Sequence, residues 1–186
     1  MPVEQSWDLL AIDGQLLAAT NSGVYAVNGD QAAFVRRSVN DDFPACVFHR
    51  SRQDSQRVFV GLFNGLACLR RENGVWRDVG RAPGIQDEIL TLVETEDGRL
   101  WAGTRSTGVL RLTFARNGEK IWQEVQAERF GLEKDLPEGY AGVYEINGVP
   151  YFSTLDNIYR FDAGKQRFVA DSIFMAVHPH AEGGTI

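Results

Sequence analysis

Hydrophobic and polar residues alternate along this chain in short stretches that are separated by turn residues. Alternation with a period of two predicts β-strands with one buried side. The same strand–turn–strand pattern occurs in residues 16–27, 58–69, 100–112 and 150–161. Anchored at Thr20, Leu62, Thr104 and Thr154, the repeats lie 42, 42 and 50 residues apart. A period of about 40–45 residues is typical of β-propeller blades.

Dipeptides that favour two-residue hairpin turns recur at two places in each repeat. Asn-Gly and Asp-Gly suit these turns because both residues tolerate positive φ angles. Three precede the anchor strand and the others follow the second strand: Asp13-Gly14, Asp97-Gly98 and Asn147-Gly148, then Asn28-Gly29, Asn73-Gly74, Asn117-Gly118 and the equivalent Ala163-Gly164. Each repeat therefore contains four strands, A to D, with tight A–B and C–D turns.

The third repeat shows the predicted unit in full, with strands at residues 89–94, 100–104, 109–114 and 121–125. No segment has a sustained helical period, which argues against an α/β fold. The chain is therefore predicted to be all-β, with four four-stranded antiparallel β-propeller blades that form a partial propeller. The predicted blades are residues 7–37, 45–80, 88–126 and 140–172, and residues 173–186 would begin a further blade.

Loop length separates the two ends of the predicted blades. The A–B and C–D corners are mostly tight turns and line one face, which we call the turn face. The B–C loops and the longer D–A connections, residues 39–45, 81–88 and 130–140, line the opposite loop face. Binding residues lie preferentially on variable loops held by a rigid scaffold, so the loop face is the expected location of function.

Composition limits the classes of partner. The 186 residues carry a net charge of −6 without any basic run, which argues against binding to nucleic acid or to an anionic membrane. Two cysteines, Cys46 and Cys68, do not make a disulfide scaffold and leave the redox compartment open. No stretch approaches the length of an apolar transmembrane helix, so no direct membrane contact is expected in this segment. The N-terminus lacks the pattern of a signal peptide.

Several polar and aromatic residues fall on the predicted loop face. Asn21, Phe63, Arg105 and Asp156 lie in the B–C loops, and two acidic pairs lie in the D–A connections, Asp41-Asp42 and Asp87-Glu88. Together they would suit a polar ligand with an aromatic contact. The acidic pairs could bind a cation or sugar hydroxyls. The alternative is that all of these residues are ordinary solvated loop residues.

Catalytic and metal-binding patterns are absent from the sequence. Nucleophile-elbow, zinc-protease and P-loop motifs do not occur, and no catalytic residue, metal site or cofactor is predicted. His178 and His180 flank a proline without supporting ligands, and His49 lies on a predicted strand, where a structural role is expected. Trp101, like the tryptophans at positions 7, 76 and 122, is expected to pack between blades or at an edge.

The third repeat also resembles a known family. Its residues read Pro83, Glu94-Thr-Glu-Asp-Gly98, Leu100-Trp-Ala-Gly-Thr104 and Gly108-Val109. This pattern resembles the two-component regulator propeller repeat, which occurs in extracytoplasmic (periplasmic) sensor domains of bacterial hybrid histidine kinases. The resemblance implies a non-enzymatic role in signal input, with a small molecule or a glycan as ligand. Any kinase activity would then belong to other domains of a parent protein.

Two further functions remain open, and the repeat raises one structural question. The blades could instead form a scaffold for protein partners, or a propeller lyase, which would need histidine and acidic residues near the axis. Four blades do not complete a seven- or eight-bladed ring. The terminal blades are therefore expected to expose apolar faces and to favour self-association.

Overall fold

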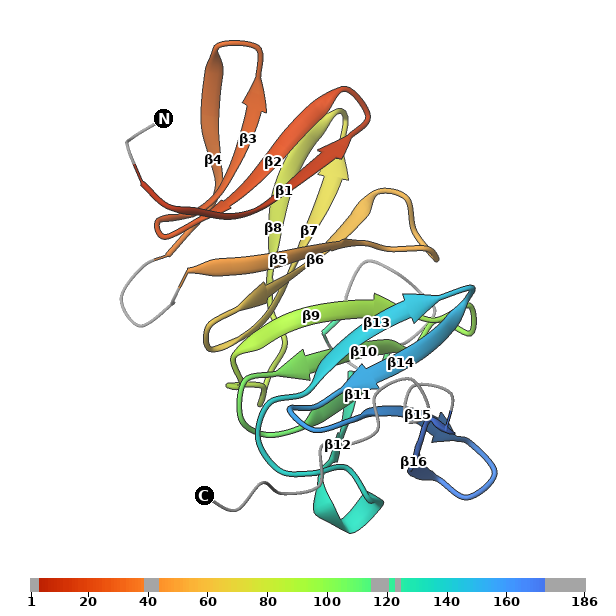
Figure 1. Ribbon diagram of the computed structural model, residues 1–186. Helices are drawn as coiled ribbons and strands as arrows, with labels where there is room; N and C mark the ends of the chain where they lie inside the picture. Colours follow the sequence, from red (N-terminus) through yellow and green to blue (C-terminus); the bar gives the residue numbers. More distant parts are fainter. Residues whose placement is uncertain (1–3, 39–43, 115–120, 123–124, 173–186) are drawn as a thin grey trace, which may run out of the picture.

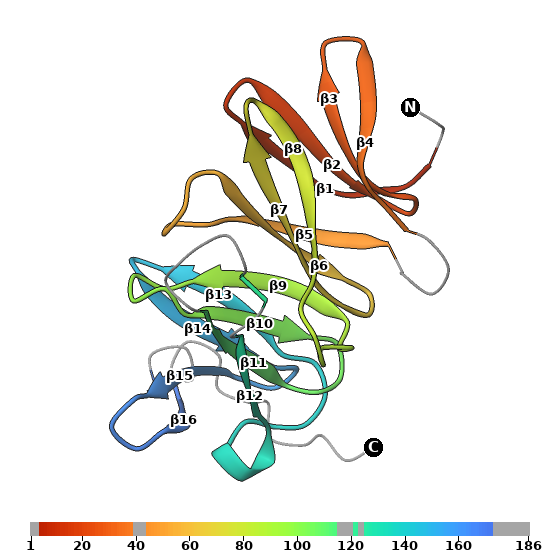
Figure 2. The same cartoon turned by 180° about the vertical axis from the view of Figure 1, so that it is seen from behind.

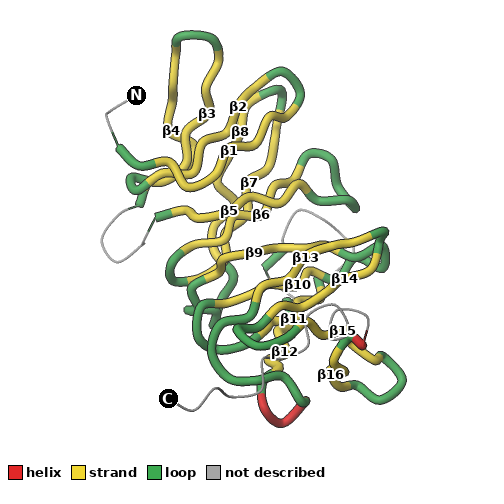
Figure 3. Tube along the Cα trace, in the orientation of Figure 1, coloured by secondary structure: helices red, strands yellow, loops and turns green. Residues whose placement is uncertain are grey.

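The computed structural model describes residues 4–38, 44–114, 121–122 and 125–172. These residues form four four-stranded antiparallel sheets with simple consecutive strand order (Figures 1 and 3). Blade 1 contains β1 (Ser6–Ile12), β2 (Gln15–Thr20), β3 (Gly23–Asn28) and β4 (Gln31–Arg37). Blade 2 contains β5 (Ala45–Arg50), β6 (Arg57–Leu62), β7 (Gly65–Glu72) and β8 (Val75–Arg81).

The remaining two blades follow the same order. Blade 3 contains β9 (Ile89–Glu94), β10 (Leu100–Thr104), β11 (Val109–Thr113) and β12 (Gln126–Phe130). A short 3-10 helix, η2 (Leu132–Lys134), precedes blade 4, which contains β13 (Gly142–Ile146), β14 (Val149–Ser153), β15 (Ile158–Asp162) and β16 (Arg167–Ala170). The all-β prediction of four propeller-like blades is confirmed, and the sheets do not close into a ring.

Three of the predicted hairpin turns have positive φ at both central residues, as type I′ geometry requires. These are Asp13-Gly14, Asn73-Gly74 and Asn147-Gly148. At Asn28-Gly29 and Asp97-Gly98, only the glycine has positive φ. Asn117-Gly118 lies outside the described residues.

The predicted fourth strand of the third repeat is wrong. The structure places β12 at Gln126–Phe130 rather than at residues 121–125. Register explains the difference, because Val109 pairs with Phe130 and Thr113 pairs with Gln126. Ile121 is buried outside any strand, and the ring of Trp122 lies edge-on to Phe114 at 5.9 Å between centroids. Ile121 and Trp122 therefore pack against the core from outside any strand.

The hydrophobic core lies between blades and not within a single sheet. Three buried clusters fill the spaces between blades 1 and 2, blades 2 and 3, and blades 3 and 4. The A strands of consecutive blades (β1, β5, β9, β13) lie next to each other, as the views from both sides show (Figures 1 and 2). Trp101, 3% exposed, contacts Phe130, Phe152, Phe161 and Phe168 between blades 3 and 4, which confirms the expected inter-blade packing.

Gly103 marks the closest approach between two blades. A Cβ atom at this position would lie 2.4 Å from the carbonyl oxygen of Ala141 and 2.3 Å from Oγ1 of Thr91. Gly61, its equivalent in blade 2, faces Ile89 of blade 3 in the same way. The glycine of the third repeat's family-like pattern is therefore required because the next blade's A strand packs directly on it.

None of the helices in the described part of the chain is both long and apolar enough to cross a membrane.

Candidate functional site

The B–C corners of the first three blades are built in the same way. In each, the residue after the anchor donates its backbone N–H to the carbonyl of the residue that directly precedes strand A. The pairs are Asn21 to Gln5 (3.3 Å), Phe63 to Pro44 (3.2 Å) and Arg105 to Glu88 (3.1 Å). The shared hydrogen bond places the side chains of Asn21, Phe63 and Arg105 at matched positions on the loop face.

The fourth corner differs from the prediction. Ser153 pairs with Gly142 just as Gly103 pairs with Thr91, so Thr154 corresponds to Thr104 and Leu155 corresponds to Arg105. Asp156 therefore lies one residue beyond the matched position. Leu155 occupies that position with 84% of its surface exposed. The acidic pair Asp41-Asp42 lies outside the described residues.

Asn21 and Phe63 are joined through Trp7, which sequence reasoning treated only as a packing residue. The indole Nε1 of Trp7 donates to Oδ1 of Asn21 at 2.8 Å. The indole ring also lies edge-on to Phe63, with 5.2 Å between ring centroids. Trp7 remains 43% exposed, so this contact between blades 1 and 2 presents an aromatic surface to solvent.

Glu88 and Arg105 form an ion pair at the entrance to blade 3. Nε of Arg105 donates to Oε2 of Glu88 at 2.6 Å, and this hydrogen bond with the carboxylate charge raises the pKa of Arg105 above its ordinary value. Cys46 of blade 2 lies close enough to Glu88 and Arg105 for both charges to affect its pKa. Burial and the Glu88 charge raise the pKa of Cys46 to about 12, although Arg105 acts in the opposite direction. Cys46 is therefore a neutral thiol at physiological pH and not an activated nucleophile.

Asp87, next to Glu88, is a buried carboxylate of this face. Its side chain is 5% exposed, and its Oδ1 accepts hydrogen bonds from Oγ1 of Thr107 and Nη1 of Arg129, both at 2.5 Å. Burial alone would raise the pKa of Asp87, but these two hydrogen bonds and the Arg129 charge outweigh burial and lower it. Asp87 therefore stays ionised at neutral pH.

Two oxygens of this acidic pair are left without a partner in the described structure. Oδ2 of Asp87 and Oε1 of Glu88 are buried, and neither accepts a hydrogen bond from a described residue. A buried carboxylate oxygen without a donor is costly, so a donor is expected to complete it. We call the group formed by Asp87, Glu88, Arg105, Thr107 and Arg129 the acidic-pair cluster.

Two residues of this cluster escaped sequence reasoning. Thr107 could have been found from the sequence, because it lies in the same short corner as the repeat anchor Thr104. In the structure the hydroxyl groups of these two residues lie 3.0 Å apart. Arg129 was missed because the D strand of this repeat was placed too early. With β12 at its true position, Arg129 lies opposite Leu110 and next to the loop face.

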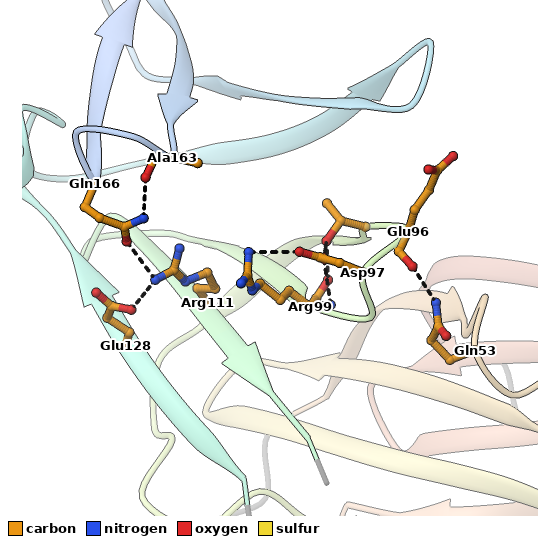
Figure 4. A network of polar contacts seen from close by, with 9 residues as sticks. Gln53, Glu96, Asp97, Arg99, Arg111, Glu128, Ala163 and Gln166 are labelled. Atoms are coloured by element: carbon orange, nitrogen blue, oxygen red, sulfur yellow. Dashed lines mark hydrogen bonds and ion pairs between the residues drawn. The ribbon is translucent and has the colours of Figure 1, made fainter. Parts of the chain in front are cut away.

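The turn face carries a separate polar network, which links three blades (Figure 4). Gln53 of blade 2 donates to the carbonyl of Glu96 at 3.0 Å, and Arg99 pairs with Asp97 at 2.8 Å. Arg111 pairs with Glu128 at 2.5 Å and donates to Gln166 of blade 4 at 3.3 Å. Because the contacts drawn in Figure 4 stabilise turns, join neighbouring strands or link blades, this network is structural.

Glu94 explains why the third repeat needs an acidic residue before its Asp-Gly turn. Its carboxylate, 1% exposed, accepts from Oγ of Ser51 at 3.1 Å and from the backbone N–H of Arg52. Glu94 therefore holds the A–B turn of blade 2 against blade 3. The family-like residues Glu94, Trp101 and Gly103 all join blades, and none of them lies on the loop face.

His49 also has the structural role that its strand position predicted. Its Nε2 accepts the backbone N–H of Glu94 at 3.2 Å. Burial and the positive charge of Arg52 lower the pKa of His49 to about 4, so the ring is neutral at pH 7. His178 and His180 lie outside the described residues. Among the described residues, no three metal-ligating side chains form a group that could hold an ion.

Comparison with known proteins supports the fold. No family model and no curated protein sequence matches the chain. Among solved structures, the extracellular domain assigned to the hybrid two component system BT4673 from B. thetaiotaomicron superposes with a TM-score of 0.68 at 14% identity, over 90% of this chain. The equivalent domain of BT3049 from B. thetaiotaomicron superposes with a TM-score of 0.62 at 17% identity, over 91% of this chain.

A lyase has a similar fold. Virginiamycin B lyase from Staphylococcus aureus superposes with a TM-score of 0.62 at 10% identity, over 89% of this chain. The chain spans 21% and 23% of the two extracellular domains and 54% of the lyase. At these identities the likeness establishes a propeller-like fold, and the structural neighbours include extracellular domains of two-component systems.

Proposed function

We propose that this chain is a signal-input segment of an extracytoplasmic sensor propeller of the two-component regulator kind, and that it is not an enzyme. The observation that carries the proposal is the fold likeness to extracellular domains of two-component systems. The family-like residues of the third repeat, Glu94, Trp101 and Gly103, support it because each contributes to the inter-blade contacts that define the array.

The ligand would bind at the acidic-pair cluster on the loop face. Asp87 and Glu88 each have one buried carboxylate oxygen without a described partner, and their other oxygens pair with Arg129 and Arg105. A neutral molecule rich in hydroxyl groups fits this arrangement, because hydroxyls donate to carboxylates without adding charge. Trp7 and Phe63, which lie on the adjacent corners, supply an aromatic surface of the kind on which sugar rings pack. A mono- or oligosaccharide is therefore the proposed ligand class.

Thermal shift followed by calorimetry on the 186-residue chain tests this binding. The probes are neutral monosaccharides (glucose, galactose, xylose, arabinose) and their oligomers of two to six units. We expect at least one series to raise the melting temperature, and Glu88→Gln to weaken that binding about tenfold, since a carboxylate–hydroxyl hydrogen bond contributes about 1.5 kcal/mol. Arg99→Gln, at the exposed turn face, is the matched control and should bind normally.

Two outcomes would count against the proposal. If no neutral saccharide binds, the ligand class is wrong. If Glu88→Gln binds as tightly as the parent while Arg99→Gln does not, the site lies on the turn face instead.

A protein-interaction scaffold is the second candidate function. Two exposed leucines favour it, Leu155 (84% exposed) and Leu132 near η2 (62% exposed). Isolated large apolar side chains on loops can anchor a partner. The lyase alternative has less support. His49, the histidine among the described residues, is neutral and occupied by an inter-blade hydrogen bond.

A further inference from the structure

One tryptophan is exposed on the loop face, where it touches both blade 1 and blade 2. Trp7 is 43% exposed, whereas Trp76 and Trp101, which also pack between blades, are 4% and 3% exposed. Tryptophan side chains are highly buried on average, because their large apolar surface is unfavourable in water. The exposed ring of Trp7 is therefore a feature of this face that needs a physical explanation.

The ring of Trp7 is held in one orientation although it is exposed. Its indole Nε1 donates to Oδ1 of Asn21 at 2.8 Å, and its ring stands at 80° to that of Phe63. Both partners lie in B–C corners that are themselves fixed. The backbone N–H of Asn21 donates to Gln5, and that of Phe63 donates to Pro44. A ring that is already ordered loses little conformational entropy when a ligand packs on it.

Asn21 adds a hydrogen-bond donor beside this ring. Its Oδ1 is occupied by Trp7, and no described residue accepts a hydrogen bond from its Nδ2, which belongs to an exposed side chain. A sugar ring matches this combination, since its C–H groups pack on an aromatic face and its hydroxyl oxygens accept from an amide. We call the group formed by Trp7, Asn21 and Phe63 the aromatic corner.

The aromatic corner and the acidic-pair cluster offer complementary chemistry. The cluster supplies acceptors, the buried Oδ2 of Asp87 and Oε1 of Glu88. The aromatic corner supplies an apolar surface and the amide donor of Asn21. Each sugar hydroxyl both donates and accepts. A saccharide chain can therefore use both groups at once.

The two groups are connected along the loop face through blade 2. The carbonyl oxygen of Pro44 accepts the N–H of Phe63 and lies 3.9 Å from Sγ of Cys46. Cys46 in turn lies close enough to Glu88 for that charge to affect its pKa. Strands β1, β5 and β9, which begin at these corners, are neighbours in both ribbon views (Figures 1 and 2). The aromatic corner and the acidic-pair cluster therefore lie on consecutive blades.

We infer that the aromatic corner is a second sugar subsite, and that one saccharide chain occupies it together with the acidic-pair cluster. Packed sheets lie about 10 Å apart, which is longer than one sugar ring, so a chain of at least two rings is needed to reach both. Two subsites that bind one molecule act together through effective concentration, so affinity rises with chain length. The inference rests on the proposed function for its ligand class.

Calorimetry on the 186-residue chain tests the dependence on chain length. The probes are glucose, galactose, xylose and arabinose and their oligomers of two to six units. In the series that binds, we expect affinity to rise about tenfold or more from one unit to the length that covers both subsites, and to level off beyond it. Affinity independent of chain length would overturn the inference and leave the proposed function intact. Binding in no series would overturn both.

Trp7→Ala tests the aromatic corner directly. This variant should lower the ratio of oligosaccharide to monosaccharide affinity about tenfold, because the second subsite is lost. Glu88→Gln should instead weaken long and short saccharides alike. Val75→Ala is the matched control, since Val75 is 53% exposed on β8 and belongs to neither subsite. Far-UV circular dichroism and thermal unfolding establish that each variant folds. A Trp7→Ala chain that keeps the full gain with length would overturn the inference.

Tryptophan fluorescence gives a second readout in the unmodified chain. A sugar ring that packs on Trp7 removes it from water, so a bound oligosaccharide should shift the emission to shorter wavelength and reduce quenching by acrylamide. Trp76 and Trp101 are buried and should not respond. The response should disappear in Trp7→Phe, which keeps an aromatic ring at this position. A bound oligosaccharide without this response, or a response that persists in Trp7→Phe, would place the ligand elsewhere and overturn the inference.

Discussion

Blades 3 and 4 share strand order and register, but they differ in the exposure of their forward faces, the sheet faces that point away from the preceding blade. The forward face of blade 3, with Trp101 and Gly103, is buried beneath blade 4. On the forward face of blade 4, Tyr144 holds the position of the buried Val93 and is 48% exposed. The comparison shows that one register position belongs to the core in blade 3 and to the surface in blade 4.

The largest expected contrast is at the aromatic position. Trp101→Ala removes a side chain that contacts four phenylalanine rings, and it should destabilise the chain by about 3–5 kcal/mol, as large aromatic truncations in cores do. Tyr151→Ala, at the equivalent register position of blade 4, should cost less, about 1 kcal/mol, because Tyr151 is half-buried rather than fully buried. Urea unfolding of both variants, under conditions where the chain is monomeric, measures the difference. Equal losses would mean that the side chain of Tyr151 is packed as extensively as that of Trp101.

The next contrast concerns pH and the position held by His49 in blade 2 and Tyr144 in blade 4. The folded pKa of His49 is lowered to about 4, mainly by burial, so between pH 6.5 and 4 the unfolded chain binds a proton that the folded chain does not. Stability should therefore fall as pH falls through this window, by up to about 3 kcal/mol. Tyr144, whose pKa is raised by its hydrogen bond with Tyr140 and by burial, stays neutral throughout.

His49→Gln is the matched variant for this contrast. Its amide oxygen can still accept the N–H of Glu94 but does not titrate in this window. Unfolding free energies measured at half-unit steps should lose most of their slope between pH 6.5 and 4 in this variant. An unchanged slope would assign the pH dependence to other groups.

The smallest contrast is at the glycine position. Gly103→Ala places a Cβ against the backbone of Ala141 and should cost about 2 kcal/mol, because well-packed sites resist added volume. Ser153→Ala, at the same register position of blade 4, should change stability by no more than about 0.5 kcal/mol. Thermal unfolding of the pair measures this, and a neutral Gly103→Ala would mean that the blades separate more easily than the structure indicates.

Local patterns were sufficient to predict most of the blades. Alternation and Asn-Gly turns located the B and C strands of all four repeats and the A strand of the third, because side-chain period and positive-φ turns are properties of neighbouring residues. The failure at β12 has a physical cause. Ile121 is buried in the blade 2–3 core, and Trp122 packs against that core and Phe114. No local pattern encodes these contacts.

The candidate site was predicted only in part. The loops identified the acidic pair Asp87-Glu88 and the corner residues Asn21, Phe63 and Arg105. The structure joins Glu88 to Arg105 directly, and it joins Asn21 to Phe63 through Trp7. Asp156 proved to be one residue away from the matched position. Partners from distant strands, Arg129 above all, could not be identified without the register of β12.

The sequence by itself determined that this chain is an all-β array of four blades with a turn face and a loop face, since those features depend on residues within one repeat. Only the tertiary structure decided which side of each blade is covered and which carboxylate oxygens remain without a donor. It also explained why Glu94, Trp101 and Gly103 occur together in the third repeat. The physical reason is that the core of a propeller forms between repeats. Its contacts join residues about one repeat apart, and their partners become known only when the blades are stacked.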